Sequence, residues 1–410
     1  MRWPFVAKSL LPSDLSEKSE SHSRRFAFRL FRQLTAEPKA GNVFFSPASV
    51  MLCLWPLHDG ATGETREAMA KVLEVAGLES RELQSVVSAL RSALQIEGPG
   101  LKIEAANSLW CNQRLKPRSE YIAGVKENYG ADVFALDFGE DQAAARINAW
   151  VAEKTHGKIG GILSSLDPLA FLIAINAIYF KDSWKERFMA EFTREELFFT
   201  SDGQKLKVPL MSQYGSYSYF EDSRVQAVCL PYKTSRLAMY VFLPAKKSSL
   251  REFLLDLDSG AWDKWMRRLR TMEGHLRLPR FKLTYQASLN GPLAQLGMAT
   301  AFNPQHARFD AISPPPPAIW IDAVLHRAFV EVNEEGTEAA ATTGVLMAVS
   351  AKYQQPPTRR FEMIVDRPFF FAICDSFTST LLFMGSVETP DSEVIVSEAS
   401  EGQIEDRIAD

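Results

Sequence analysis

The sequence lacks several features that would assign it to a broad class of protein. Its 410 residues contain only four cysteines, Cys53, Cys111, Cys229 and Cys374. Each has apolar neighbours and no CxxC or other metal-ligand spacing occurs, which indicates buried free thiols. No apolar run is long enough to span a bilayer, because the longest, residues 169–180, is broken by Asn176 and is typical of a buried strand.

The chain also lacks a strong net charge of either sign. The chain has 46 Lys and Arg against 50 Asp and Glu, and the basic residues are scattered. A nucleic-acid-binding surface needs clustered basic residues, so we expect no nucleic-acid partner. No basic helix indicates a polyanion cofactor, and the sequence leaves the use of one open. Residues 1–11 show no secretory signal and the chain has no Asn-x-Ser/Thr sequon, so these features leave the compartment open.

Catalytic and ligand-binding motifs are also absent. The chain has no GxSxG, HExxH, Walker A or GxGxxG pattern, and its six histidines lie far apart without a paired motif. We therefore expect no enzyme, no metal and no cofactor. A catalytic triad assembles only in three dimensions, so the sequence alone leaves that alternative open.

What the chain does contain is a charge-free stretch close to its C-terminus. Three carboxylates, Glu334, Glu335 and Glu338, surround Gly336, and residues 339–351 then carry no charge at all. A solvated loop usually carries charge, proline or asparagine, because its backbone must remain in water. This stretch lacks all three and is therefore not an ordinary surface loop.

The stretch is compatible with a strand. At a period of two residues, the face that begins at Thr337 is first small, then apolar, and never charged. Such a face can be buried in a sheet without stranding an ion. An alanine-rich helix is the alternative, which Thr342, Thr343 and Gly344 disfavour. The pattern alone leaves both structures open.

Several ordered motifs resemble one family. Residues 334–341, Glu-Glu-Gly-Thr-Glu-Ala-Ala-Ala, resemble the hinge of the reactive-centre loop in serpins, the serine protease inhibitors, and residues 363–373 resemble that family's C-terminal signature. The similarity extends over about residues 26–390. Asp182 is a departure, because the family usually has Gly there, and Asp would tolerate a positive φ less well.

The resemblance implies the α/β (mixed α+β) serpin fold, with three β-sheets, about nine helices and an exposed reactive-centre loop over about residues 334–357. It also implies a metastable native state. The serpin domain would cover residues 25–390. Residues 1–24 are polar and Ser-rich and are expected to form a flexible tail, and residues 391–410 an acidic disordered tail.

Site residues are implied by the same resemblance. Three groups are expected: for the hinge Glu334, Gly336, Thr337, Glu338, Ala339, Ala340, Ala341, Thr342 and Thr343; for the buried polar shutter Ser46, Ser49, Asn176 and His326; and for the breach, where the loop first enters the sheet, Trp184 and Arg280. Glu334 and Arg280 should lie within salt-bridge reach. The simpler alternatives are a satisfied core histidine, a core tryptophan and two unrelated surface charges.

Family spacing of seventeen residues from Glu334 places the reactive bond at Ser350–Ala351, with Val349 and Lys352 as alternatives. A small residue at that position suits an elastase-like or subtilisin-like protease, whereas Lys352 would suit a trypsin-like one. Cleavage would be followed by insertion of the loop into the central sheet. The small residues of the hinge favour rapid insertion, and hence inhibition.

The expected partner is therefore a serine protease, or alternatively a cysteine protease, held in a covalent acyl complex by a monomeric chain. A non-inhibitory serpin, acting as a carrier or chaperone and cleaved only as a substrate, is the alternative function. No nucleic acid or membrane partner is expected. The resemblance implies an extracellular protein. A cytoplasmic location is the alternative, because no signal peptide is visible.

Overall fold

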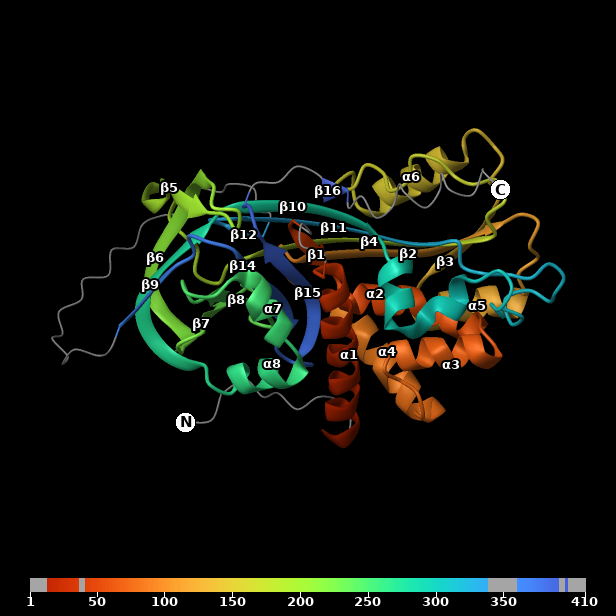
Figure 1. Cartoon of the computed structure of the whole chain (residues 1–410), viewed down its shortest axis with the longest axis horizontal. Coiled ribbons are helices and arrows are strands. Elements are labelled where there is room, and N and C mark those ends of the chain that lie inside the picture. The colour runs from red at the N-terminus through yellow and green to blue at the C-terminus, as the bar shows by residue number, and fades with distance from the viewer. Residues whose placement is uncertain (1–12, 37–40, 338–359, 391–394, 397–410) are drawn as a thin grey trace.

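The structure, a computed structural model, describes residues 13–36, 41–337, 360–390 and 395–396 (Figure 1). Its strands form one seven-stranded and one nine-stranded sheet. Helix α6 (Ala143–Lys154) lies on one face of the seven-stranded sheet, and helices α1 to α5, which lie between Ser13 and Tyr129 in the sequence, lie on the other side (Figure 1). The seven-stranded sheet is therefore covered on both faces and is the centre of the fold.

The seven-stranded sheet has the order β16-β10-β11-β12-β4-β2-β3. Its strands are β2 (Lys102–Asn112), β3 (Asp132–Leu136), β4 (Leu172–Ser183), β10 (Phe281–Ser288), β11 (Ala323–Asn333), β12 (Gly336–Thr337) and β16 (Ile395–Val396). Strands β4 and β11 run parallel to each other, and β12 enters between their ends. Nearly every residue of β4 is buried, which explains its continuous apolar sequence.

The nine-stranded sheet is organised by one long strand. Its members are β1 (Val43–Phe45), β5 (Arg194–Phe199), β6 (Lys205–Glu221), β7 (Val225–Pro231), β8 (Leu237–Pro244), β9 (Arg270–Pro279), β13 (Phe361–Ile364), β14 (Phe369–Asp375) and β15 (Thr380–Val387). Strand β6 pairs with β5 and β9 over most of its length and with β7 through its last residues. The expected three sheets therefore correspond to the seven-stranded sheet and to two parts of the nine-stranded sheet. Strand β6 joins these two parts, because it pairs with β5 and β9 on one side and with β7 at its end.

The described residues contain nine α-helices, as the resemblance implied. They are α1 (Ser13–Leu34), α2 (Pro47–Gly60), α3 (Gly63–Val72), α4 (Ser80–Leu94), α5 (Ser119–Tyr129), α6 (Ala143–Lys154), α7 (Leu250–Asp256), α8 (Ser259–Met266) and α9 (Asn290–Leu293). Helix α2 begins as its sequence predicts, with Ser46 as the N-cap and Pro47 in the first turn. It is buried almost throughout beneath the central sheet.

Parts of both predicted tails have regular secondary structure. Helix α1 begins at Ser13, within the predicted flexible tail, because this segment contains helix-forming Glu and Lys that extend the amphipathic helix. Arg24 also lies 3.3 Å from Asp263, an ion pair that fixes the helix against α8. At the other end, Ile395–Val396 form strand β16 on β10, since β-branched residues favour strands even between acidic neighbours.

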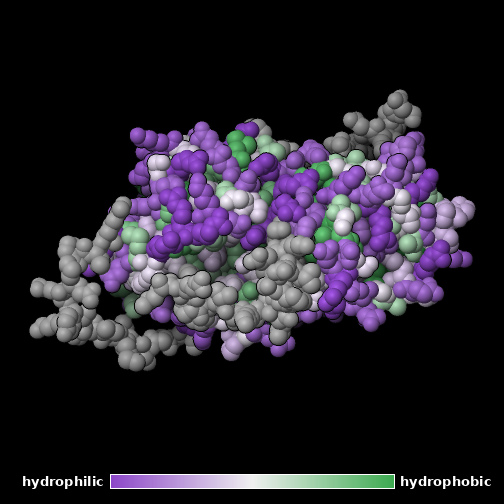
Figure 2. Space-filling model, turned by 90° about the horizontal axis from the view of Figure 1, so that it is seen from below, coloured by the Kyte–Doolittle hydropathy of each residue, from purple (hydrophilic) through white to green (hydrophobic). Residues whose placement is uncertain are grey.

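The surface and the thiols agree with the composition. All four cysteines are buried and free, as predicted, so the fold needs no disulfide and suits either compartment. The visible face in Figure 2 is mostly hydrophilic, with small separate hydrophobic areas. Within the described ranges, no helix is long and apolar enough to cross a membrane, and no group of three or more His, Cys, Asp or Glu residues could hold a metal ion.

Candidate functional site at the hinge of the loop

The base of the expected loop is already paired inside the central sheet. In β12, Thr337 lies opposite Val332 of β11 and Asp182 of β4, and its side chain is fully buried. We expected an exposed loop from about Glu334, and that expectation is wrong up to Thr337. The alternating small face of this segment allows it, because nothing charged has to enter the sheet at Thr337.

The rest of the predicted loop, residues 338–357, lies outside the described residues. Glu338 and residues 339–343 of the predicted hinge lie outside the described residues. The same holds for the predicted reactive bond, Ser350–Ala351, and for its alternatives Val349 and Lys352. Their roles therefore remain predictions, and the described part of the site is the hinge base with the groups that hold it.

Gly336 is required by two independent features of the hinge base. Its φ is +150°, a backbone conformation that residues with a side chain rarely adopt. A Cβ atom at this position would also lie 2.3 Å from the carbonyl oxygen of Asp182 and 2.5 Å from the Cα of Ser183. Both contacts are with the backbone of β4, so a rotation of a side chain cannot relieve them.

Replacing Gly336 by Ala should therefore release β12 from β4. The strained conformation and the backbone clash together should cost about 1–3 kcal/mol. We expect a lower thermal unfolding midpoint and faster hydrogen exchange at the end of β4. Gly203→Ala is the matched control, because Gly203 has a φ of +84° but nothing within 4 Å of the added Cβ. Equal effects of the two substitutions would contradict the assigned clash.

Two aromatic side chains hold the hinge base in place. The Tyr232 hydroxyl lies 2.7 Å from the Thr337 hydroxyl, and the Tyr232 ring stacks on Trp184 at 4.7 Å between centroids. The Trp184 indole donates to the carbonyl oxygen of Asn333 at 2.9 Å, and its backbone N–H donates to that of Glu335, also at 2.9 Å. Trp184 is thus a core aromatic and also a direct hydrogen-bond donor to the hinge backbone.

The predicted contact between Glu334 and Arg280 is confirmed. The Arg280 Nε donates to both carboxylate oxygens of Glu334 at 2.8 Å. Burial alone would raise the pKa of Glu334, but the hydrogen bonds from Arg280 and Thr193 outweigh burial and lower that pKa below its usual value. Thr193 was not predicted, because a single threonine ahead of a short strand carries no distinguishing pattern.

Asp182 occupies its unusual position without backbone strain. It lies within strand β4, and it is not among the residues with a positive φ. Its carboxylate accepts hydrogen bonds from the Thr234 hydroxyl at 2.9 Å and from the Ser183 backbone N–H at 2.8 Å. Burial nevertheless raises the pKa of Asp182 to about 6. An ionisable carboxyl group therefore lies directly beside the paired Thr337.

The four residues predicted for the shutter lie together where the start of α2 meets strands β4 and β11. The Asn176 amide group donates to the Ser49 hydroxyl at 2.6 Å, and its oxygen lies 2.5 Å from the His326 Nδ1. Ser46 accepts from the Ser49 backbone N–H at 3.2 Å. Asn107, which sequence reasoning missed, accepts a second bond from Asn176 at 2.5 Å. An asparagine at the start of the buried half of strand β2 was the available signal.

His326 is a neutral cross-link between the strands that flank the hinge base. It lies opposite Asn176 in the pairing of β11 with β4 and is fully buried. Burial lowers its pKa to about 3, so Nδ1 donates to Asn176 from a neutral ring. Within the described residues the second ring nitrogen, Nε2, has no hydrogen-bond partner. Separating β11 from β4 would break this contact.

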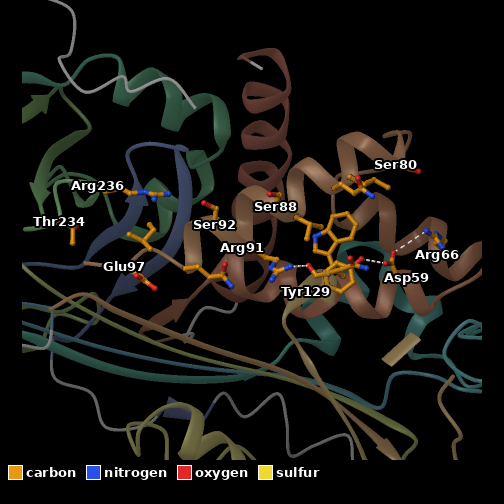
Figure 3. A pocket seen from close by; sticks show the side chains of 17 residues that line it. Asp59, Arg66, Ser80, Ser88, Arg91, Ser92, Glu97, Tyr129, Thr234 and Arg236 are labelled. Carbon is orange, nitrogen blue, oxygen red and sulfur yellow. Dashed lines mark hydrogen bonds and ion pairs between the residues drawn. The ribbon is translucent and has the colours of Figure 1, made fainter. Parts of the chain in front are cut away.

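A cavity of about 830 Å³ lies apart from the hinge base, along α4 and beside the ends of α2 and α5 (Figure 3). Several of its polar groups are engaged with one another or with neighbouring backbone. The Tyr129 hydroxyl donates to Asp59, Arg66 lies 3.8 Å from the same carboxylate, and Arg91 donates to two carbonyl oxygens at the end of α5. No residue predicted for the hinge, shutter or breach is among the described residues that line it.

One Ser–His–Glu group bears on the alternative of an enzyme. The Ser212 hydroxyl lies 2.8 Å from the His275 Nε2, and the His275 Nδ1 lies 3.9 Å from a Glu362 carboxylate oxygen. The second distance is too long for the hydrogen bond that orients a catalytic histidine. Glu362 also lies 3.9 Å from Arg277, so it is shared between two partners. This geometry does not form a catalytic triad.

Comparison with known proteins decides the family. The family model described as Serpin (serine protease inhibitor) matches residues 21–390. The chain belongs to the serpin family. This agrees with the resemblance of the hinge and of the C-terminal signature. Because the family is one of protease inhibitors, the chain is a protease inhibitor by family and not an enzyme.

Sequence relatives of this serpin come from distant organisms. An uncharacterized serpin-like protein of Thermococcus kodakarensis is 35% identical over 367 residues, which cover 89% of this chain and 84% of that protein. The leukocyte elastase inhibitor of Sus scrofa is 32% identical over 386 residues, 91% of this chain and 100% of the inhibitor.

Solved structures show the same fold. The native thermophilic serpin tengpin has a TM-score of 0.82 and 27% identity, over 94% of this chain and 96% of its own. Human thyroxine-binding globulin has a TM-score of 0.82 and 26% identity, over 92% of this chain and 100% of its own. The serpin fold predicted for this chain is thus confirmed.

Proposed function

We propose that this serpin inhibits a serine protease by acting as a suicide substrate. The protease cleaves the loop near Ser350–Ala351, and the loop then inserts as a strand between β11 and β4. The observation that carries this proposal is the position of Thr337, which is already paired and buried between those two strands. The insertion site therefore has its first residue in place.

The chemistry follows from the bond that is attacked. The protease hydroxyl adds to the carbonyl carbon of Ser350, the peptide bond breaks, and Ala351 leaves as a new amino terminus. The protease remains attached to Ser350 as an acyl ester. Inhibition requires insertion to outrun hydrolysis of that ester, so relative rates decide the outcome. The small residues Ala339, Ala340 and Ala341 support fast insertion, because they need little space in the sheet.

The proposed target is an elastase-like or subtilisin-like enzyme, with a cysteine protease as the alternative. The small Ser350 supports this target class. The relatives named leukocyte elastase inhibitor, at 32% identity in pig and human, point in the same direction. The chain would act as a monomer that forms one covalent complex with one protease.

The test mixes the chain separately with elastase, subtilisin and trypsin and follows each mixture on denaturing gels. We expect an SDS-stable complex with elastase or subtilisin, and mass spectrometry should find a released C-terminal peptide that begins at Ala351. Cleavage without any complex would contradict the proposal and favour a non-inhibitory carrier or chaperone. A peptide that begins at another residue would move the reactive bond but leave inhibition intact.

A further inference from the structure

The C-terminal segment takes part in the central sheet, although it lies beyond the region that matches the family. The family match ends at residue 390. Beyond it, β16 pairs in parallel with β10, with Ile395 opposite Tyr285 and Val396 opposite Gln286. In the described part of the chain β10 pairs only with β11 and β16, so β16 is the outermost strand on that side (Figure 1).

Well-defined contacts lead the chain to this position. The Asn42 side chain donates to the Thr389 carbonyl oxygen at 2.6 Å and accepts from the backbone N–H groups of Glu388 and Thr389 at 2.6 and 3.0 Å. One residue later, the Pro390 carbonyl oxygen accepts from the Lys282 backbone N–H of β10 at 3.2 Å. The segment is thus fixed beside β10 before β16 begins.

The two contacts with β10 follow a single direction. From Lys282 to Tyr285 the strand advances three residues, about 10 Å at the rise of an extended chain. From Pro390 to Ile395 the chain advances five residues, and five residues can span more than this 10 Å, since an extended chain covers about 3.3 Å per residue. The Pro390 contact and the β16 pairing are therefore mutually consistent, and the pairing is not an isolated contact of two residues.

The local sequence suits an edge strand. Val394, Ile395 and Val396 are three consecutive β-branched residues, which favour extended backbone. Glu393 and Glu398 lie on either side of them. Natural sheets protect their edges by placing charges on the outermost strand, because a bare edge presents unpaired N–H and C=O groups to other chains. The tail combines strand-forming residues with such flanking charges.

We propose that strand β16, Ile395–Val396, is an intramolecular cap that closes the β10 edge of the central sheet against a second copy of this chain. Without the cap, β10 would be the exposed edge of a large sheet and could pair with a strand of another molecule. This role is independent of the proposed inhibition. A tail variant can therefore fail the test below while the chain still traps a protease, and the reverse also holds.

The first test measures hydrogen exchange of the β10 backbone in the full chain and in three variants. In Ile395→Pro/Val396→Pro, one of the two replaced N–H groups must point to β10, because alternate N–H groups of a strand face its neighbour. A second variant ends at Pro390. Gly402→Pro/Gln403→Pro is the control, since it places two prolines in the same tail outside the paired residues.

We expect exchange of the β10 residues beside β16 to become about tenfold faster in the first two variants, because the local opening free energy of an uncovered edge is lower. The control should match the full chain. A synthetic peptide of residues 391–400, added to the chain that ends at Pro390, should slow the exchange again. Unchanged exchange of β10 after truncation would overturn the pairing.

The second test addresses what the cap prevents. Light scattering coupled to size-exclusion chromatography should show self-association of the truncated chain and of Ile395→Pro/Val396→Pro. The full chain and Gly402→Pro/Gln403→Pro should remain monomeric at the same concentration, and excess peptide should reverse the association. If β10 exchange rises but every variant remains monomeric, the proposed protection against a second copy is wrong.

Discussion

Thr337→Arg is expected to convert this serpin from an inhibitor into a substrate. Thr337 is fully buried between β11 and β4, and its hydroxyl lies 2.7 Å from the neutral hydroxyl of Tyr232. An arginine there would have to bury an unpaired charge, at a cost of several kcal/mol. The hinge base would leave the sheet, and insertion after cleavage would be slowed at its first step.

The size of the effect follows from competition between insertion and hydrolysis. A barrier to insertion raised by about 3 kcal/mol slows it roughly a hundredfold, while hydrolysis of the acyl ester is unaffected. The number of inhibitor molecules consumed per protease inactivated should rise by a similar factor, and the SDS-stable complex should disappear. Titration of protease activity against inhibitor concentration measures that number directly.

The matched control is Thr337→Val, which also loses the contact with Tyr232 but introduces no charge. It should lower stability by about 1 kcal/mol and leave inhibition largely intact. The rate at which protease cleaves the loop should be similar in both variants, which shows that each is folded and presents its loop. A Thr337→Arg chain that still forms complexes with wild-type stoichiometry would refute burial of this side chain during inhibition.

The parts of the site that could be predicted from the sequence are those whose residues lie in short motifs of the family. The ion pair of Glu334 with Arg280 and the clustering of Ser49, Asn176 and His326 follow from family positions, and the structure brings these side chains within hydrogen-bond distance. Central strand β4 was predictable for a simpler reason, since a continuous apolar run between polar segments is typical of a strand covered on both faces.

The missed contacts share a physical cause. Tyr232 reaches Thr337 across 105 positions of sequence, and the Asn107 contact with Asn176 spans 69. Periodicity reports which face of a strand is buried but not which distant side chain lies against it. Short strands are hidden for another reason. Both β12 and β16 contain two residues, and such pairings depend on the neighbouring strands more than on local propensity.

The second large effect expected is acid destabilisation through His326. Its pKa is about 3 in the folded chain and 6.5 in the unfolded chain, because burial penalises the charged ring. Between these values the unfolded state binds the proton and the folded state does not, so stability falls as pH falls below 6.5. From pH 6.5 to 5.0 this single group should remove about 2 kcal/mol.

Asp182 opposes this trend and has to be separated from it. Its folded pKa is raised to about 6 from 3.8, so the folded state binds the proton more readily and gains stability as pH falls through 6. Comparison with His326→Gln isolates the histidine, because glutamine can still donate to the Asn176 oxygen and does not titrate. Both chains keep Asp182, whose contribution therefore cancels in the difference.

Thermal unfolding midpoints of the two chains at pH 7.5, 6.5, 5.5 and 5.0 provide the measurement. The midpoint difference should be constant above pH 6.5, and below it the wild-type chain should lose several degrees relative to His326→Gln. Because His326 joins β11 to β4, its protonation should also loosen the strands that hold Thr337, and exchange at the end of β4 should quicken in acid only in the wild-type chain. Parallel pH profiles of the two chains would contradict this prediction. They would show that the pKa of His326 does not differ between the folded and the unfolded chain, and that the shutter does not contribute to any loss of stability in acid.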